Sequence, residues 1–502
     1  MLNRRRFLGV STLAASAGIT AGTQAQVARP AASTPTRLGE GAPRRIIHVV
    51  ADGMSHGTLC CADQFSRIER GKPLTWTRLL NEPGTHSAFM DMRSLDSMVT
   101  DSAAASSSWG CGRRVRNGTL NVSSKGKPLQ PLMQLFGQAG WKRGLVTTTE
   151  ITHATPAGFT VSVDSRSQGS DIAVLYLARR LDVFLGGGQN HFDPAKRKDK
   201  RNLYSEFLCD GYYVAKTRED LAHAPLDQPW LGTFSGGHLP YTLDRRADAN
   251  LLKTVPSLAE MVDRALAKLG RHDRFLLQVE GGRVDHGAHN NDAAAALREQ
   301  VALDEAIDRI VAFQEMHPGT LVVLTTDHGT GNPGLNGMGS DYKDSPKLFR
   351  HLSDHKASFS TILGKLKKAS SITESGRVLA EYTGYKADEK KLLRFLPFLS
   401  GKGSPLFDGL KSETSGLGQL LANHTGVSFT SGQHTSDYVS LLAFGPGSDR
   451  FRGLIRNTDV FETYTDLAGI DFRNPEEPLL AEAASIQGLS TREENVGEYA
   501  VA

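Results

Sequence analysis

Short apolar segments that end abruptly at polar residues recur along this chain, and they constrain its fold more than any other feature. Such runs occupy residues 46–51, 274–282, 320–329 and 438–445. Amphipathic helical patterns over 257–269 and 293–315 lie between them. Strands of nearly continuous apolar character that alternate with helices are typical of a mostly parallel sheet covered on both faces. We therefore expect an α/β fold, a three-layer α/β/α sandwich.

Polar side chains stand at or just after the ends of three of these runs. They are Asp52, Glu280, Asp327 and His328. Ligands of open α/β sheets bind beyond the carboxyl ends of the strands, so segments distant in sequence would bring these groups to one edge. Residues 338–431 are richer in Lys, Ser and Gly, with amphipathic stretches at 359–368 and 389–399. We interpret this region as an insertion, a cap-like region above that edge.

The two ends of the chain differ from its body. Residues 1–25 join Arg4, Arg5 and Arg6 to a small-residue apolar stretch that ends in T-Q-A, which is the pattern of a signal peptide. The arginines before Phe7 and Leu8 favour the twin-arginine route, with an ordinary secretory signal as the alternative. We therefore expect a periplasmic or secreted protein. The remaining expected divisions are a linker (26–42), a main domain (43–337 and 432–480) and a C-terminal tail (481–502).

Composition excludes some classes of protein. The formal net charge is +4, but three positive charges lie in the leader, so the mature chain is close to neutral and a general nucleic-acid binder is disfavoured. No apolar run approaches the roughly 20 residues that span a membrane. Four cysteines in an exported chain permit three full disulfide pairings, and we interpret them as packing or disulfide residues: Cys60, Cys61, Cys111 and Cys209.

The segment E-G-G-R-V-D-H-G-A-H (280–289) carries the strongest local signal. Asp285 and His289 are four residues apart, so on a helix they share a face, and a carboxylate with an imidazole is a common zinc pair. A helix cap beside a solvated histidine is the alternative. His434 precedes the last predicted strand, and a lone histidine gains meaning only from neighbouring ligands.

Two further segments offer a nucleophile and an anion-binding group. Ser102 precedes a run of small, helix-compatible residues, where a serine is most often a helix N-cap. Its hydroxyl is a weak nucleophile without a G-x-S-x-G turn, an objection that a metal ion bound to its oxygen would remove. The second segment carries His153, Thr155 and Arg166. The planar guanidinium of Arg166 matches two phosphate oxygens.

Taken in order, these motifs resemble the alkaline phosphatase family over roughly residues 45–337 and 434–472. The matching segments are D-G-M at 52–54, T-D-S-A-A at 100–104, T-H-A-T-P-A at 152–157, E-G-G-R-V-D-H-G-A-H at 280–289 and T-D-H at 326–328. Two departures leave the ligands intact. Ala51 stands where the family usually has Gly, and the loop after His328 reads G-T-G-N rather than E-T-G-G.

The resemblance implies hydrolysis of phosphate monoesters to an alcohol and inorganic phosphate, through a phosphoserine at Ser102, with Arg166 and His286 on the substrate side. It implies a first zinc ion held by Asp285, His289 and His434. A second zinc ion would be held by Asp52, Asp327, His328 and the Ser102 oxygen. A third ion, usually magnesium, would be held by Asp52, Thr155 and Glu280, with His153 as a neighbour that makes the identity of this ion less certain.

Other interpretations stay open at the level of sequence. A phosphodiesterase or a sulfatase could use the same metal-binding sheet, although no sulfatase C/S-x-P-x-R motif surrounds Ser102. An exported phosphate-binding or metal-binding protein is the non-enzymatic alternative, and the complete nucleophile motif disfavours it. We expect no nucleic-acid partner and no membrane span. A homodimer is common in the family. We expect His351 and His355 in the insertion to be solvated rather than ligands.

Overall fold

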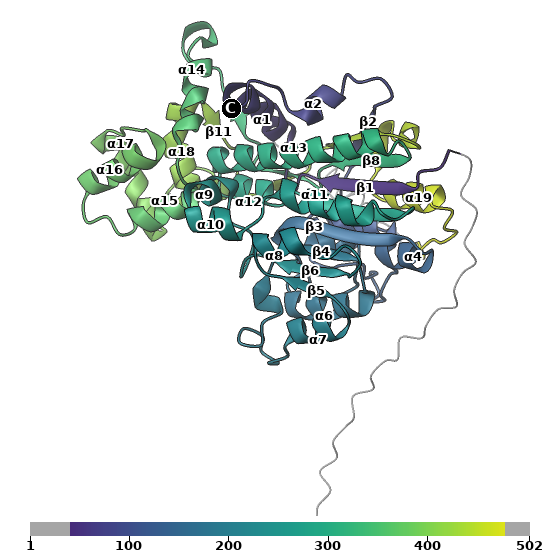
Figure 1. Cartoon of the computed structure of the whole chain (residues 1–502). Helices are drawn as coiled ribbons and strands as arrows, with labels where there is room; N and C mark the ends of the chain where they lie inside the picture. The colour runs from purple at the N-terminus through teal and green to yellow at the C-terminus, as the bar shows by residue number, and fades with distance from the viewer. Residues whose placement is uncertain (1–40, 477–502) are drawn as a thin grey trace, which may run out of the picture.

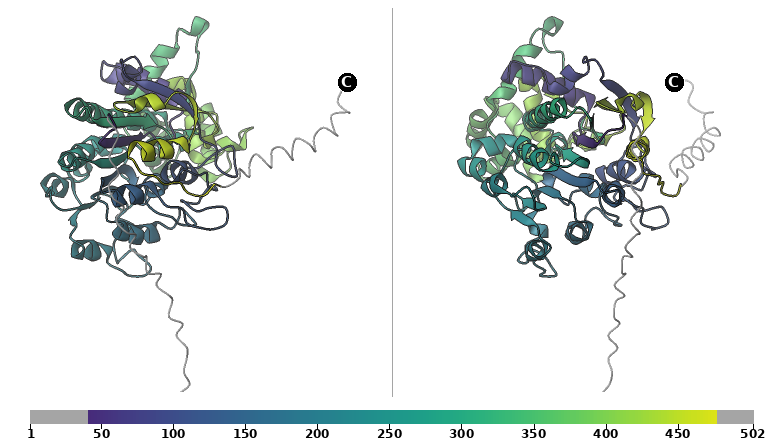
Figure 2. Two further views of the ribbon diagram at one scale, coloured as in Figure 1. Left: turned by 90° about the vertical axis from the view of Figure 1, so that its right-hand side faces the viewer. Right: turned by 45° about the vertical axis from the view of Figure 1, so that its right-hand side comes forward.

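The computed structural model describes residues 41–476. Within that range it has helices on both faces of one large sheet (Figures 1 and 2), as the sequence predicts. The predicted signal peptide, nearly all of the predicted linker and the predicted C-terminal tail lie outside the described residues.

Ten strands form the central sheet. In spatial order they are β14 (Gly453–Arg456), β2 (His86–Asp91), β13 (Val439–Phe444), β8 (Thr320–Thr325), β1 (Arg45–Val50), β7 (Phe275–Glu280), β3 (Lys142–Glu150), β4 (Val183–Gly187), β6 (Trp230–Thr233) and β5 (Tyr213–Ala215). Among the described strands of this sheet, β13 alone runs antiparallel to its neighbours, β2 and β8. The four predicted strands are therefore confirmed as β1, β7, β8 and β13. β13 is not the last strand, because β14 follows it.

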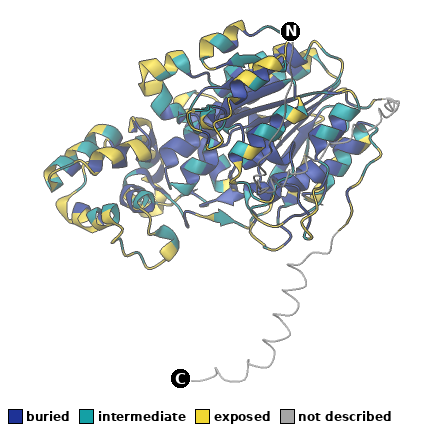
Figure 3. Ribbon diagram, turned by 90° about the horizontal axis from the view of Figure 1, so that it is seen from below, coloured by how far each residue is buried: buried dark blue, intermediate teal, exposed yellow. Residues whose placement is uncertain are grey.

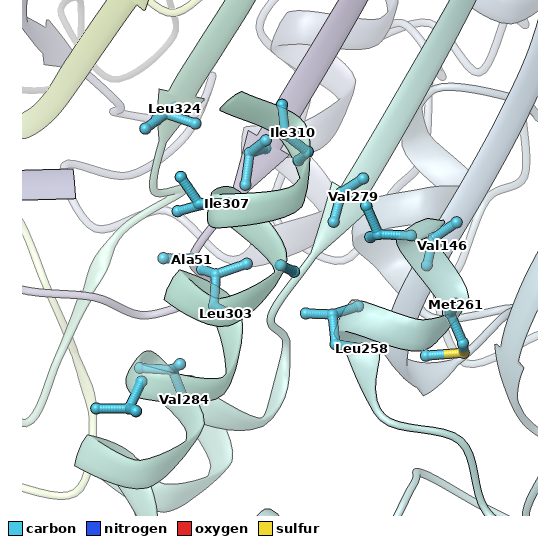
Figure 4. Close-up of a cluster of buried hydrophobic side chains, with 14 of the residues drawn as sticks. Ala51, Val146, Leu258, Met261, Val279, Val284, Leu303, Ile307, Ile310 and Leu324 are labelled. Carbon is cyan, nitrogen blue, oxygen red and sulfur yellow. The ribbon is translucent and has the colours of Figure 1, made fainter. Parts of the chain in front are cut away.

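Helices cover both faces of the sheet because its strands are apolar on both sides. Along β1, Ile47 and Val49 belong to one buried cluster, whereas Ile46 and Val50 belong to the other. The first cluster, part of which Figure 4 shows, is covered by α1 (His56–Glu69), α2 (Thr75–Leu79), α8 (Arg218–His223), α11 (Leu258–Leu269) and α13 (Ala293–Met316). The second is covered by α3 (Ser102–Cys111), α4 (Leu132–Gln138), α5 (Ala154–Gly158), α6 (Gly169–Arg179), α7 (Leu203–Cys209) and α19 (Asp459–Leu467).

The region predicted as an insertion forms a lobe beside the sheet, on the left in Figure 1. Its elements are α14 (Ser345–Arg350), the 3-10 helix η3 (His351–Asp354), α15 (Phe359–Leu366), α16 (Ile372–Thr383), α17 (Glu389–Phe395) and α18 (Glu413–Thr425). It has its own apolar cluster, which includes Ile362, Leu379 and Leu417, and its outer helices are largely exposed (Figure 3). Phe349 and Leu352 at its base belong instead to the main core.

The sequence leaves the pairing of the cysteines open and predicts no membrane span. Cys60 and Cys209 are exposed and Cys61 is buried, and none of these three is in a disulfide. The buried Cys111 lies in α3, where its Sγ donates to the Arg113 carbonyl at 3.6 Å. Among the described residues, no helix is both long enough and apolar enough to cross a bilayer.

Candidate metal centre

The turn after β1 brings the first predicted ligand into the interior. Asp52 is fully buried, and the Gly53 amide donates to Asp327 Oδ1 at 3.0 Å. Gly53 has φ +70°, and a Cβ atom there would lie 2.5 Å from Asp285 Oδ1. Only glycine combines this left-handed backbone with such a close approach. The D-G pair therefore allows the ends of β1 and β8 to meet α12 (Arg283–His289).

The first predicted ligand group comes together from α12 and a two-stranded ribbon. In the ribbon β12 (His434–Thr435) pairs with β9 (Gly329–Thr330), which places His434 beside the end of β8. His289 Nε2 lies 3.0 Å from His434 Nε2 and 3.3 Å from Asp285 Oδ2. His434 Nε2 lies 3.9 Å from Asp285 Oδ1. Two ligands of one tetrahedral zinc ion are separated by about 3.3 Å, so these spacings fit one ion.

The second predicted group surrounds Ser102. His328 Nε2 lies 3.2 Å from Asp327 Oδ2 and 3.7 Å from Asp52 Oδ1. Ser102 Oγ lies 3.3 Å from the same nitrogen. Ser102 is the first residue of α3 and not its N-cap, because Asp101 is the cap and accepts from the Ala104 amide. The serine oxygen is therefore not used in capping and faces the ligand group.

The third predicted group lies on the other side of Asp52. Asp52, Glu280 and His153 each offer a ligand atom, and these atoms lie within 4.8 Å of one another. His153 Nδ1 is 3.8 Å from Glu280 Oε1. Thr155 follows His153 by two residues, at the start of α5, and is fully buried. The sequence predicted His153 as a neighbour of this site, and the structure places its imidazole among the candidate ligands.

Buried oxygen atoms in these groups make no hydrogen bond within the described residues. They are Asp52 Oδ1 and Oδ2, Asp327 Oδ2, Glu280 Oε1 and Thr155 Oγ1. An uncompensated buried carboxylate is costly, so such atoms are normally paired or bound to cations. The donor set of the first two groups, imidazole with carboxylate, suits zinc. The residues present therefore fit bound cations.

The electrostatics of the four carboxylates agree with this fit. Burial, followed by repulsion from Asp327, Asp285 and Glu280, raises the pKa of Asp52 well above its usual value. Burial alone would raise the pKa of Asp285, but the neighbouring histidines outweigh it and hold that pKa well below its usual value. This concentration of negative charge attracts cations.

Arg166 lies beside the second and third groups. Its Nη1 donates to Asp101 Oδ2 at 3.0 Å, and its Nη2 lies 3.0 Å from His153 Nε2. The same Asp101 oxygen accepts from the Gly118 amide. The guanidinium is thus held beside the N-terminus of α3, and it is partly exposed, with 28% of its side-chain surface accessible.

The sequence analysis missed two residues of this region. Asp101 stands in the T-D-S motif, and its helix-capping pattern could have indicated it. His238 has no local signal. Its ring lies 4.4 Å from that of His286 and 5.6 Å from that of His153, between centroids, and its Nδ1 accepts from the Glu150 amide at 3.1 Å. The predicted substrate residue His286 also contacts Arg283, at 2.6 Å.

Comparisons with known proteins agree on one family. A family model described as alkaline phosphatase matches residues 43–470. The chain is 30% identical to alkaline phosphatase 4 of Bacillus subtilis over 454 residues, which is 88% of this chain and 92% of that protein. It is 32% identical to alkaline phosphatase 3 of the same species over 72% of this chain and 75% of that protein. The solved alkaline phosphatase of Thermus thermophilus has a TM-score of 0.82 and 34% identity, covering 90% of this chain and 96% of that one.

Proposed function

The chain belongs to the alkaline phosphatase family and is a phosphatase, and we propose that it hydrolyses phosphate monoesters through a phosphoserine formed at Ser102. The observation that carries the proposal is the position of the Ser102 hydroxyl. It lies at the first turn of α3, 3.3 Å from His328 Nε2. Several buried carboxylate oxygens around it have no hydrogen-bond partner within the described residues and fit bound cations. A hydroxyl in this position has a means of activation that an ordinary helix-terminal serine lacks.

We propose three ligand sets, which the family resemblance implies and which the spacing of the candidate ligand atoms supports. We assign one zinc ion to Asp285, His289 and His434, and a second to Asp52, Asp327, His328 and the Ser102 oxygen. We assign a third ion, magnesium, to Asp52, Glu280 and Thr155, with His153 adjacent. When bound, paired metal ions supply positive charge to the attacking and leaving oxygens of an in-line displacement.

In the proposed reaction, different residues of the chain have different roles. Ser102 Oγ attacks phosphorus, the phosphorus–oxygen bond of the ester breaks, and the leaving oxygen is released as the alcohol. Water then attacks the phosphoserine, which releases inorganic phosphate and restores the Ser102 hydroxyl. Arg166 binds two non-bridging oxygens of the phosphoryl group, and Asp101 keeps the guanidinium in place for this. We also assign His286 of α12 as a further substrate-binding residue.

We propose broad specificity among phosphate monoesters. The groups named above all recognise the phosphoryl group, and none of them is assigned to the alcohol part of the substrate. We also propose that the protein is exported, by the twin-arginine route, and that it forms a homodimer. Small phosphomonoesters are its substrates in this proposal, and nucleic acid is not a partner.

A hydrolysis panel tests the function. The purified protein is assayed with a phosphate monoester, a phosphate diester and a sulfate ester, before chelation, after chelation, and after zinc and magnesium are added back. We expect monoester hydrolysis that is lost on chelation and restored by the ions. A faster diester or sulfate reaction would instead assign one of the competing activities, and full monoester activity in metal-free protein would exclude the mechanism.

The variant Ser102→Ala separates an enzyme from a binding protein. We expect hydrolysis to fall at least a thousandfold, because no other residue replaces the covalent step, while inorganic phosphate still binds through Arg166. The control is Ser106→Ala, since Ser106 lies one turn further along α3 and its Oγ donates to the Thr155 carbonyl rather than facing the site. Equal turnover in Ser102→Ala and the parent would refute the phosphoserine.

A further inference from the structure

A second cluster of metal-ligand residues lies at the base of the lobe, outside the site described above. His351 and Asp354 belong to η3, and His424 belongs to α18. Each offers a ligand atom within 4.8 Å of the other two, and His351 Nδ1 lies 3.1 Å from Asp354 Oδ2. That separation is close to the roughly 3.3 Å expected between two ligands of one tetrahedral zinc ion. None of the three residues takes part in the catalytic groups.

The end of α16 positions two of these side chains. His424 Nε2 lies 3.3 Å from the Thr383 carbonyl oxygen, which can only accept, so this nitrogen carries the proton and Nδ1 keeps its lone pair. A metal-binding histidine commonly donates its other ring N–H to a backbone carbonyl in this way. Gly384 ends α16 with φ +71°, and a Cβ atom there would lie 3.2 Å from Asp354. The negative end of the helix dipole also favours a cation here.

The histidine rings around the cluster are close together. The His351 and His424 rings stack with centroids 4.2 Å apart and planes 19° apart, and the Tyr385 ring packs on His424 at 4.8 Å. His355 is 3% exposed, and neither of its ring nitrogens makes a hydrogen bond within the described residues. The prediction that His355 is solvated is therefore wrong. Three histidines at one place repel when protonated, whereas neutral imidazoles are ligands.

We propose that His351, Asp354 and His424 bind a divalent transition-metal ion, for which Zn²⁺ is the best match. Two imidazoles and one carboxylate suit zinc, whereas magnesium and calcium prefer oxygen donors. Asp354 has 53% of its side-chain surface exposed, so the ion can enter from solvent and water can complete its coordination. This site is independent of the proposed phosphatase mechanism.

The ion would join the lobe to the main core. The Leu352 carbonyl in η3 accepts from Arg298 of α13 at 3.0 Å, and the Leu352 side chain belongs to the main core. On α18, Leu417 and Leu421 belong to the separate core of the lobe. His351 and His424 are about 70 residues apart in sequence. A metal link across so long a segment restricts the unfolded chain and stabilises the attachment of the lobe.

Zinc stoichiometry on the full chain tests the proposal. The wild type, His424→Gln, His351→Gln and the control His223→Gln are dialysed against the same buffered micromolar Zn²⁺, and zinc is counted by mass spectrometry. His223 is an exposed histidine of α8 outside every ligand group. We expect one zinc ion fewer per chain in each cluster variant, no loss in the control, and an unchanged kcat/KM in all of them. Equal zinc counts in the parent and both cluster variants would overturn the site.

Anomalous diffraction at the zinc edge locates the ion directly. We expect a peak between His351, Asp354 and His424 in wild-type crystals and none in His424→Gln. If the histidine variants do not fold, Asp354→Asn replaces them, since this exposed side chain has no packing role in the core. A peak that forms only at millimolar zinc would contradict a structural link, as would an equal rise in Tm with added zinc in the parent and in the variants.

Discussion

At the scale of single residues, the proposed role of Arg166 depends on the position of its guanidinium, which Asp101 fixes, as well as on its charge. Asp101 accepts from its guanidinium through one carboxylate oxygen and from the Ala104 amide of α3 through the other. One side chain therefore fixes both the helix that carries Ser102 and the cation that meets the phosphoryl group. Such an arrangement holds the groups in place before the substrate arrives.

Replacing Arg166 by Lys keeps the charge but removes the planar fork. We expect kcat/KM for a phosphate monoester to fall about 10- to 100-fold, because one ammonium group cannot make two parallel hydrogen bonds to phosphate. Steady-state kinetics and inhibition by inorganic phosphate measure the loss. Asp101→Asn is the comparison, since the amide can still cap α3. It should weaken phosphate binding less than Arg166→Lys, and the reverse order would contradict the assigned roles.

A second residue-scale prediction concerns pH. His48 is fully buried in β1, its Nδ1 lies 2.8 Å from the Tyr464 hydroxyl, and burial lowers its pKa to about 3. The unfolded chain binds a proton at this histidine below about pH 6.5, whereas the folded protein does not. The stabilisation from the neutral ring is therefore complete above pH 6.5 and is lost as the pH falls towards 3.

The variant His48→Gln isolates this effect. Urea unfolding of both proteins at pH 7.5 and 5.0 should show that the stability advantage of the wild type shrinks by about 2 kcal/mol at the lower pH, from a slope of about 1.4 kcal/mol per pH unit. The other histidines titrate in both proteins and cancel in the difference. An advantage of the same size at both pH values would show that His48 is protonated in the folded protein.

The sequence predicted ligands better than it predicted the residues that position them. Asp52, Asp285, Asp327 and His328 are recognisable because few side-chain types bind metals and each stands beside a strand end or in a short motif. The structure brings them together, while their roles stay predictions. His238 could not be found in this way, because its contact with His286 joins segments nearly 50 residues apart that no local pattern connects.

At the scale of elements, the start of α13 is also an attachment point for the lobe. Asp292 caps α13 by accepting from the Ala295 amide at 3.0 Å, and its other oxygen accepts from the Phe359 amide at 2.6 Å, where α15 begins. Both helices therefore begin at one buried carboxyl group. Burial raises its pKa to about 7, so ionising it has a cost that these amide donors reduce.

Removing this carboxyl group should destabilise the protein and loosen the lobe. We expect Asp292→Ala to lower the free energy of unfolding by about 2–4 kcal/mol, since it removes a cap and leaves a buried amide without an acceptor. The control Ser257→Ala removes only the N-cap of α11, which should cost about 1 kcal/mol. Hydrogen exchange should rise in α15 for Asp292→Ala alone. A similar rise in both variants would contradict the link.

The direction of one strand could not be predicted from its residues. The apolar runs of β1, β7, β8 and β13 are alike in sequence, because each is buried on both faces. β13 nevertheless runs antiparallel to β2 and β8, so its N-terminal end lies at the edge where the parallel strands end. This direction explains why His434, which precedes β13, lies beside His328, which follows β8. Pairing geometry of this kind depends on the whole chain.

At the scale of the whole molecule, the site brings four carboxyl groups together in the interior. Asp52, Glu280 and Asp327 are 0% exposed, Asp285 is 4% exposed, and several of their oxygens have no hydrogen-bond partner within the described residues. Asp52 lies between the groups and is repelled by the other three carboxylates, which contribute to its raised pKa. Bound cations would convert this repulsion into attraction that joins β1, β7, β8 and α12.

Metal removal should therefore reverse the sign of the effect of Asp52→Asn on Tm. Chelation should lower Tm, since each ion present at a thousand times its Kd adds about 4 kcal/mol to stability. In the metal-loaded protein, Asp52→Asn should lower Tm, because it removes a ligand shared by two groups. In the chelated protein the same variant should raise Tm relative to the chelated parent, because it removes one of four mutually repelling carboxylates.

Calorimetry of the parent and of Asp52→Asn, each metal-loaded and chelated, measures this change of sign in the Tm difference. Asp63→Asn provides the matched control. Asp63 is also a buried aspartate, but its carboxylate pairs with Arg67 and accepts from the Leu74 amide, away from the site. It should lower Tm by a similar amount with and without metal. If Asp52→Asn behaves like this control, Asp52 is a structural hydrogen-bonding residue. If the two effects have opposite signs, the buried carboxylates are retained for the cations they bind.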